Sequence, residues 1–259
     1  MELKFLGTGG SRFVTASQRR RTAGIVVKTG ETQIHVDPGP GALVYANSSL
    51  ESPESTEAVV VSHAHLDHAS DAEPIIEMIT EGNDHPGAVF ANKTVLEGYG
   101  DIEKSVSDYY QDLCQDVNAI VDGSRCEFKD VVIQVQEMSH GDPKTAGFTI
   151  EDREQKIGFW TDSDYLEDLT GFYEGCDVLV TYCTMPRGKS IKGHTSVDEA
   201  AAIAEKVQPN TMIVTHFGMS LLNEDLEKQK EWLDKNTECK VVFAEDGMKF
   251  PGNRSLGDF

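Results

Sequence analysis

The sequence contains no apolar run that approaches the ~20 residues a membrane-spanning helix requires. The opening segment, Met1 to Gly10, has neither the basic flank nor the apolar core of a secretory signal peptide. Hydrophobic residues make up 39% and charged residues 26% of the 259 positions, which is typical of a globular protein. We therefore expect a cytoplasmic protein that folds as one large domain or as two half-domains.

Paired cysteines are also missing. The chain has five cysteines, an odd number, and no two of them form a CxxC pair. This excludes the usual patterns of a disulfide framework and of a structural zinc ribbon, so we interpret the thiols as core residues. The five are Cys114, Cys126, Cys176, Cys183 and Cys239.

Basic residues are scarce. The chain has 23 Lys and Arg against 44 Asp and Glu, a formal charge of −21, which argues against binding extended DNA or a long RNA. Adaptation to high intracellular salt would explain the same charge, and the sequence does not decide between the two. Two local basic groups are candidates for contacting an anionic substrate, although both could be solvated surface charges. They comprise Arg19, Arg20, Arg21, Arg187, Lys189 and Lys192.

Short strand-like runs separated by turns account for most of the chain. Capping boxes at Ser70 with Glu73 and at Ser196 with Glu199 predict two helix starts. Ser11 to Arg21 is a poor helix, and residues 93 to 120 look helical and rich in acids, as in an insertion or lid. The predicted strands are Leu3 to Leu6, Gly24 to Lys28, Gln33 to Val36, Val131 to Val135, Phe148 to Ile150, Ile157 to Trp160, Val178 to Thr181, Met212 to Val214 and Val241 to Phe243.

The segment from His63 to His68 is the most informative part of the chain. It places four potential metal ligands, His63, His65, Asp67 and His68, directly after the apolar run Val59 to Val61. The first two can point to one position and the last two to another, which fits two metal ions about 3.5 to 4 Å apart. Imidazoles mixed with a carboxylate favour zinc, with manganese or iron as further candidates. The alternative is a polar surface turn that is rich in histidine by chance.

Four further candidate ligands follow predicted strands. Asp37, His140, Asp162 and His216 each come at or just after the end of such a run. Taken singly, each could be an ordinary turn aspartate or a hydrogen-bonded core histidine. Functional side chains gather in loops at strand ends, so the four placements together predict one site.

This order of motifs resembles the metallo-β-lactamase superfamily over nearly the whole chain. Three further features are similar to the branch that contains ribonuclease Z and the phosphoribosyl cyclic phosphodiesterases. They are Leu6-Gly7-Thr8-Gly9-Gly10, Gly193-His194-Thr195-Ser196, and the pair Val214-Thr215-His216 and Asp246-Gly247-Met248. The resemblance implies an α/β fold, a four-layer αββα sandwich formed by a single domain over residues 1–259. It also makes a homodimer plausible.

The resemblance further implies the ligand set. His63, His65 and His140 would hold one metal, Asp67, His68 and His216 the other, and Asp162 would bridge both. Asp37 would fix the geometry of the motif. A hydroxide shared by the metals would be the nucleophile. Catalytic roles fall on Asp67 and on His194, which in the resembling phosphodiesterases assists the leaving group; a capping-region surface histidine is the alternative.

We therefore predict a dinuclear metal-dependent hydrolase, with zinc as the first candidate metal. Its substrate would be a phosphodiester, either a nucleotide-like small molecule or an RNA end, and the acidic charge favours the small molecule. The first alternative is hydrolysis of a β-lactam, lactone or thioester, because the same nucleophile attacks carbonyls. A noncatalytic metal-binding module is the second alternative, although it predicts a broken ligand set.

Overall fold

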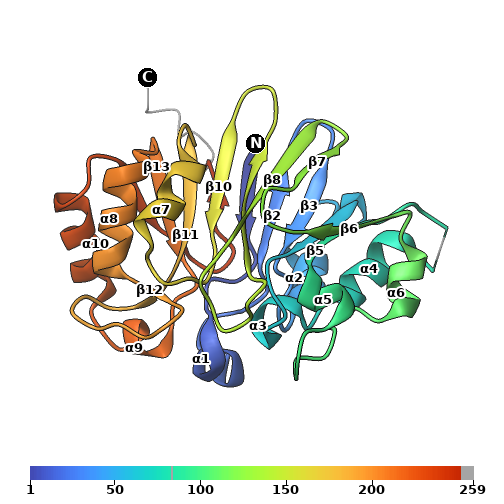
Figure 1. Cartoon of the computed structure of the whole chain (residues 1–259), viewed down its shortest axis with the longest axis horizontal. Coiled ribbons are helices and arrows are strands. Elements are labelled where there is room, and N and C mark those ends of the chain that lie inside the picture. The colour runs from blue at the N-terminus through green and yellow to red at the C-terminus, as the bar shows by residue number, and fades with distance from the viewer. Residues whose placement is uncertain (83, 252–259) are drawn as a thin grey trace.

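Two β-sheets face each other at the centre of the protein, which we describe from a computed structural model for residues 1–82 and 84–251 (Figure 1). The first sheet has the strand order β15 (Lys249–Phe250), β1 (Glu2–Phe5), β2 (Ile25–Lys28), β3 (Gln33–Val36), β4 (Ala58–Val61), β5 (Ala88–Asn92) and β6 (Asp116–Ile120). The second has the order β14 (Lys240–Phe243), β13 (Thr211–Thr215), β11 (Val178–Met185), β10 (Lys156–Trp160), β9 (Ala146–Glu151), β8 (Val131–Glu137) and β7 (Arg125–Phe128), while β12 (Thr195–Ser196) pairs with β11.

Helices cover the outer face of each sheet (Figure 1). On the first sheet lie α2 (Ala42–Ser49), α3 (Leu66–Ala69), α4 (Ala72–Thr80), α5 (Lys93–Glu97) and α6 (Asp108–Leu113), with a 3-10 turn at Pro53–Ser55. On the second lie α7 (Glu167–Thr170), α8 (Val197–Val207), α9 (Met219–Leu222) and α10 (Leu226–Lys235), with a 3-10 turn at Gly171–Tyr173. Helix α1 (Ser11–Ser17) lies at the bottom of Figure 1 and contacts both α3 and α9. The predicted four-layer αββα sandwich is confirmed.

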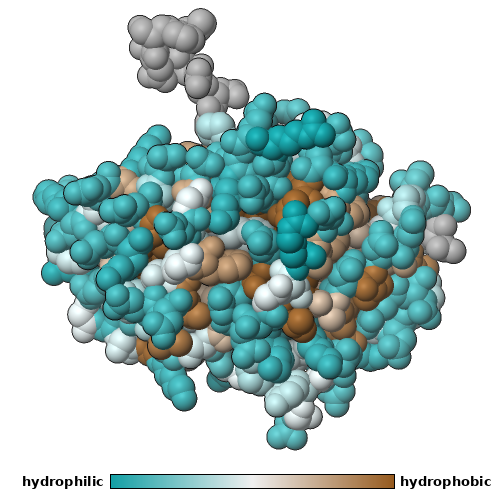
Figure 2. All heavy atoms as spheres, turned by 45° about the horizontal axis from the view of Figure 1, so that its top comes forward, coloured by the Kyte–Doolittle hydropathy of each residue, from teal (hydrophilic) through white to brown (hydrophobic). Residues whose placement is uncertain are grey.

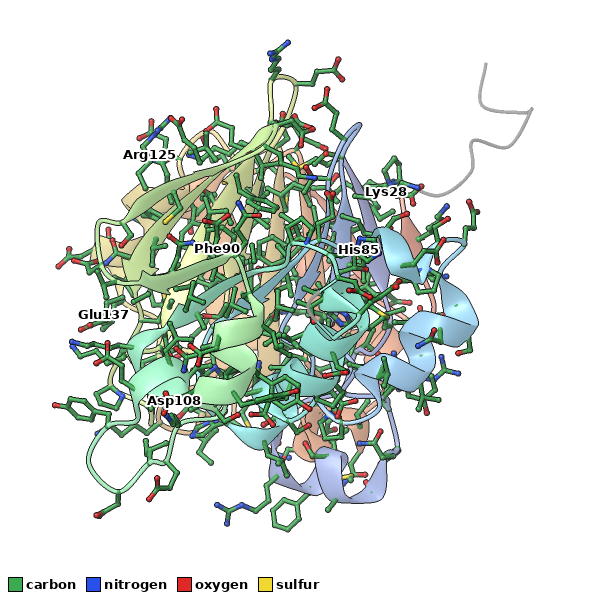
Figure 3. All side chains as sticks on the ribbon, turned by 90° about the vertical axis from the view of Figure 1, so that its right-hand side faces the viewer. Lys28, His85, Phe90, Asp108, Arg125 and Glu137 are labelled. Atoms are coloured by element: carbon green, nitrogen blue, oxygen red, sulfur yellow. The ribbon has the colours of Figure 1, made fainter. Side chains whose placement is uncertain are left out.

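Apolar side chains form one core between the sheets and one under each helical layer. Strand β8 alternates, with Val131, Ile133 and Val135 buried, because only one of its faces lies against the other sheet. Strands β4 and β13 are buried at every position, as expected for parallel strands covered on both faces. Figure 3 shows Phe90 of β5 among the side chains between the sheets, whereas Arg125 lies at the periphery.

The face of the molecule shown in Figure 2 is mainly hydrophilic, with hydrophobic areas between the hydrophilic side chains. This agrees with the large number of acidic residues in the sequence. Within residues 1–82 and 84–251, the structure has no helix whose length and apolar character would allow it to cross a membrane.

Both predicted helices form, but one of the two predicted capping boxes does not. Ser196 and Glu199 form the predicted capping box at the start of α8. Ser70, however, is in helical conformation at the end of α3, so it cannot adopt the extended backbone of an N-cap. Helix α4 begins at Ala72, and the carboxylate of Glu73 accepts a hydrogen bond from the backbone N–H of Ser107 instead.

Two other segments differ from their predictions. Residues 93–120 contain the short helices α5 and α6, but Asp116–Ile120 forms the edge strand β6, paired in parallel with β5. Ser11–Ser17 is a helix, contrary to the prediction. As expected, this helix is not the crossover of a βαβ unit, because the strands on either side of it, β1 and β2, are antiparallel neighbours.

The core between the sheets predicts a large effect for Phe159→Ala. Phe159 is fully buried and stacks on Phe148, its partner on the neighbouring strand, with ring centroids 4.8 Å apart. We expect its truncation to lower the free energy of unfolding by ~3–5 kcal/mol, measured by urea denaturation. Phe13→Ala is the control, since the ring of Phe13 is 69% exposed and its loss should change the unfolding free energy by less than ~0.5 kcal/mol. Equal effects of the two changes would contradict this description of the core.

Candidate metal centre

The carboxyl ends of the parallel strands in both sheets meet at one edge of the sandwich. Strands β3, β4 and β5 run parallel in the first sheet, and β10, β11 and β13 in the second. All seven residues that the sequence predicts as metal ligands converge there, in overlapping groups whose donor atoms lie within 4.8 Å of one another. The seven are His63, His65, Asp67, His68, His140, Asp162 and His216.

Three imidazoles form the first group. His65 Nδ1 lies 3.0 Å from His63 Nε2 and 3.0 Å from His140 Nε2. Tetrahedral zinc with Zn–N bonds of 2.0–2.1 Å would separate such nitrogens by about 3.3 Å, so the spacing fits a shared ion. Burial lowers the pKa of His140 to about 4 and that of His63 well below its ordinary value. These rings are therefore neutral at pH 7, which is the form that binds metal.

A carboxylate and two imidazoles form the second group. His216 Nε2 lies 3.0 Å from His68 Nε2 and 3.3 Å from Asp67 Oδ2. In addition, Asp67 Oδ2 accepts a hydrogen bond of 2.6 Å from the backbone N–H of Ser11, which fixes its orientation. This arrangement offers three further ligands for a second ion.

Asp162 lies between the two groups. Its Oδ2 is 3.5 Å from His68 Nε2 and 3.8 Å from both His63 Nε2 and His140 Nε2. Its Oδ1 is buried and accepts no hydrogen bond of good geometry from the described residues, although His216 Nδ1 lies 3.2 Å and His194 Nδ1 3.5 Å away. A buried carboxylate oxygen without a partner is costly, and a cation would satisfy it. The donor set and this orphaned atom together fit two divalent metal ions.

The second nitrogens of several of these imidazoles are held by other groups. Asp37 Oδ2 lies 3.1 Å from His68 Nδ1 and also accepts hydrogen bonds from the hydroxyls of Ser62 and Tyr182. Thr184 Oγ1 lies 3.2 Å from His216 Nδ1. Such contacts set the tautomer and the ring orientation of metal ligands. Asp37 has the contacts expected of the supporting role predicted for it.

Backbone geometry also brings the ligands together. Asp37 and His216 follow β3 and β13 with φ of 49° and 61°, a region that residues other than glycine rarely adopt. Gly10 packs directly on His216, because a Cβ atom at Gly10 would lie 2.1 Å from the imidazole ring. Gly10 therefore permits the close approach of the first loop to His216, and the loop does not lead into a dinucleotide-binding crossover.

The predicted residue His194 lies beside the ligand groups. Its Nδ1 is 3.5 Å from Asp162 Oδ1 and 3.4 Å from Thr184 Oγ1, and its side chain is 18% exposed. Burial lowers its pKa, but the carboxylate of Asp162 outweighs burial, so that the net shift is upward. Its neighbour Gly193 accepts a hydrogen bond of 2.6 Å from His140 Nδ1. The strand β12 and the capping box of α8 follow and fix this loop.

A cavity of about 840 Å³ opens over the ligands. Its polar lining includes His65, Asp67, Asp162, Thr184 and His194. The remaining lining residues are Ser11, Arg12, Phe13, Thr15, Ala16, Pro40, Leu66, Met185, Ile191, Met219 and Ser220.

Among the described residues that line the cavity, none of the six basic candidates is present; Arg12 is there instead. Arg19 donates to the carbonyl oxygen of Leu222. Arg20 donates to the carbonyl oxygen of Ala244 and covers Phe217. Two more guanidinium groups lie on aromatic rings, Arg21 on Tyr45 and Arg187 on Trp232, while Lys189 pairs with Glu224. Five of the six basic side chains therefore contact other residues of the protein. The sixth, Lys192, does not belong to the described lining of the cavity either.

Asp142 is a buried residue at this site that the sequence analysis did not identify. Its Oδ2 accepts hydrogen bonds from the backbone N–H of Ala64 and from Asn92 Nδ2, and its Oδ1 accepts one from Thr94 Oγ1. The carboxylate therefore joins the loop of His140 to the segment between His63 and His65. Its position two residues after His140, before a proline, was the available signal.

Asp142→Asn should weaken metal binding. The amide nitrogen of asparagine cannot accept the hydrogen bonds that the lost oxygen received, so His63 and His65 would shift relative to His140. We expect zinc affinity to fall by about 10- to 100-fold, measured by titration against a chromogenic chelator. Asp112→Asn, at an exposed position on α6, is the matched control and should bind zinc like the parent protein. Unchanged zinc affinity in Asp142→Asn would show that zinc binding does not depend on the hydrogen bonds between Asp142 and the segment from His63 to His65.

Comparison with known proteins gives the family. The sequence model described as "Beta-lactamase superfamily domain" matches residues 32–217. The chain is 34% identical over 252 residues to an uncharacterized protein of Methanocaldococcus jannaschii, covering 96% of this chain and 94% of that protein. It is 27% identical over 283 residues to the ribonuclease Z of Methanopyrus kandleri, covering 95% and 96% of the two chains.

A solved structure supports the fold assignment. The metallo-beta-lactamase fold protein YhfI from Bacillus subtilis is similar with a TM-score of 0.78 and 18% identity, covering 96% of this chain and 98% of that one. The family match includes every residue from Asp37 to His216 that converges on the site. The chain therefore belongs to the β-lactamase superfamily, with resemblance to its ribonuclease Z-like branch.

Proposed function

We propose that this protein is a dinuclear metal-dependent hydrolase of phosphodiesters. The observation that carries the proposal is Asp162, whose carboxylate faces both ligand groups and lies beside His194. Two divalent metal ions held by these groups would supply Lewis acidity and a nucleophile formed from water at neutral pH. Zinc suits the histidine-rich donor set, with manganese or iron as alternatives.

His194 would act on the leaving group. A phosphodiester releases an alkoxide, which needs a proton, and an imidazole near the reacting phosphate can donate it. His194 lines the cavity and is held in place by β12 and the capped start of α8, which directly follow it. Asp67, oriented by Ser11, would complete the machinery as a ligand of the second ion.

The similarity to ribonuclease Z supports phosphodiester chemistry, because ribonucleases cleave phosphodiester bonds. The substrate would be a nucleotide-like small phosphodiester or an RNA end. The cavity volume and the charge of −21 favour the small molecule, since RNA binding relies on Lys and Arg contacts to many phosphates. The homodimer implied by the resemblance stays a prediction, which the mass of the protein in solution would test.

Turnover of three compounds tests the reaction. We expect the zinc- or manganese-loaded protein to hydrolyse bis-p-nitrophenyl phosphate and a cyclic nucleotide, but not nitrocefin. Turnover of nitrocefin without phosphodiester turnover would instead favour the carbonyl hydrolase. Full metal occupancy with no turnover of any substrate would favour the noncatalytic module.

The proposed acid is tested by His194→Ala. This change should leave both metals bound and lower the phosphodiesterase rate by about 10²- to 10⁴-fold, because only proton transfer is lost. Metal content and initial rates are measured on the same preparation. His85→Ala is the control, since that side chain is 59% exposed, pairs with Glu81 and does not belong to the described lining of the cavity. An unchanged rate in His194→Ala would remove His194 from the mechanism.

The bridging role is tested by Asp162→Ala. Both ligand groups lose the carboxylate that faces them, so we expect lower metal occupancy together with the loss of turnover. Elemental analysis after dialysis gives the number of ions per chain. Retention of two ions would contradict the assignment of Asp162 as the shared ligand.

A further inference from the structure

Three large apolar side chains remain exposed at the mouth of the cavity over the candidate metal centre. Phe13 is 69% exposed, Leu66 66% and Ile191 52%. All three line the cavity, and together they form what we call the apolar wall. Exposed apolar side chains gathered in a hollow beside polar groups are typical of a ligand-binding surface.

Each residue of the wall is tied to the site by the chain itself. Leu66 stands between His65 and Asp67, and Ile191 precedes His194 by three residues. Phe13 lies on α1, whose first residue, Ser11, donates its backbone N–H to Asp67. Consecutive Cα atoms are 3.8 Å apart, so none of the three can lie far from the groups that would hold a reacting phosphate.

The side chains that line the cavity are of two chemical kinds. His65, Asp67, Asp162 and His194 suit metal ions and a phosphate. Met185 and Met219 add further apolar surface to that of the wall. Among the described lining residues, only Arg12 is a permanent cation, so the lining offers little charge for a second phosphate. Its apolar part suits an uncharged organic group attached to the phosphate.

We propose that the apolar wall binds a nucleobase of the substrate, a proposal that rests on the proposed phosphodiesterase function. A base is planar, and its faces stack on an aromatic ring such as Phe13 and contact thioether sulfur well. A volume of about 840 Å³ is within the range of sites that enclose one small ligand, and a nucleotide is of that size. The phosphate of the same molecule then reaches the ligand groups.

The wall therefore determines which phosphodiesters are bound well. A base contributes binding through contact with Phe13, Leu66 and Ile191, whereas a sugar phosphate without a base leaves these side chains in water. Stacking uses only the planar face of the base, so it needs no hydrogen bonds to the edges of the base. We infer a preference for nucleotides over sugar phosphates, with little discrimination among the four bases.

Binding of two product-like compounds to the zinc-loaded protein tests the wall. AMP and ribose 5-phosphate share the sugar and the phosphate and differ in the base, and calorimetry measures their affinities without any turnover. We expect AMP to bind at least about 10-fold more tightly, as stacking of one base on an aromatic side chain allows. Phe13→Ala should remove most of this preference and leave the affinity for ribose 5-phosphate unchanged.

Tyr109→Ala is the matched control, because this ring is 63% exposed on α6 and does not line the cavity. It should keep the preference for AMP. Equal affinities of the parent protein for AMP and ribose 5-phosphate would overturn the proposal, as would tighter binding of octyl phosphate than of AMP, which would indicate an alkyl chain as the occupant.

The proposed phosphodiesterase reaction and the proposed role of the apolar wall can be contradicted independently. A preference for AMP that depends on Phe13, found in a protein that hydrolyses no phosphodiester, would support the wall and contradict the reaction. Phosphodiester hydrolysis without any preference for AMP would overturn the wall and leave the reaction standing.

Discussion

The buried carboxylate of Asp37 is the interaction on which the site depends. It accepts hydrogen bonds from the backbone N–H and the hydroxyl of Ser62, next to His63, and it contacts His68. It also accepts the hydroxyl hydrogen bond of Tyr182, which belongs to the other sheet. Hydrogen bonds to a buried charge are each worth ~1.5–3 kcal/mol. One carboxylate thereby fixes the spacing of the two sheets where the ligand groups meet.

Sequence reasoning found the residues that converge on the candidate site because their signal is local. His63 to His68 is compact, and Asp37, Asp162 and His216 follow apolar runs that form strands. Tyr182 and Asp142 act through contacts across the fold. The sequence marks Asp142 only by its nearness to His140, and the residues next to Tyr182 do not mark it at all. The capping box at Ser70 failed for a related reason, since the preceding residues had already formed α3. Edge strand β6 has only one buried residue, so its periodicity gives little evidence of a strand.

The positive charge that a substrate would meet at the cavity and the side chains that would select the substrate have different sources. The chain is strongly acidic, yet several of its arginines serve internal contacts, with guanidinium groups lying over Phe217, Tyr45 and Trp232. A local cluster of basic residues in a sequence therefore does not by itself identify a phosphate site. In this fold positive charge for a substrate would come from bound metal ions, and selectivity would come from the surrounding side chains.

The packing of Gly10 on His216 links the first loop of the chain to a residue more than two hundred positions later. The same loop is held by Asp246, which accepts a hydrogen bond of 2.7 Å from the hydroxyl of Thr8. Because a ribosome releases a chain from its N-terminus, the second ligand group cannot close until Asp246 has emerged. The first group also waits for later residues, because His140 Nδ1 is held by the carbonyl oxygen of Gly193. Both halves of the candidate centre therefore depend on strands that are synthesised late.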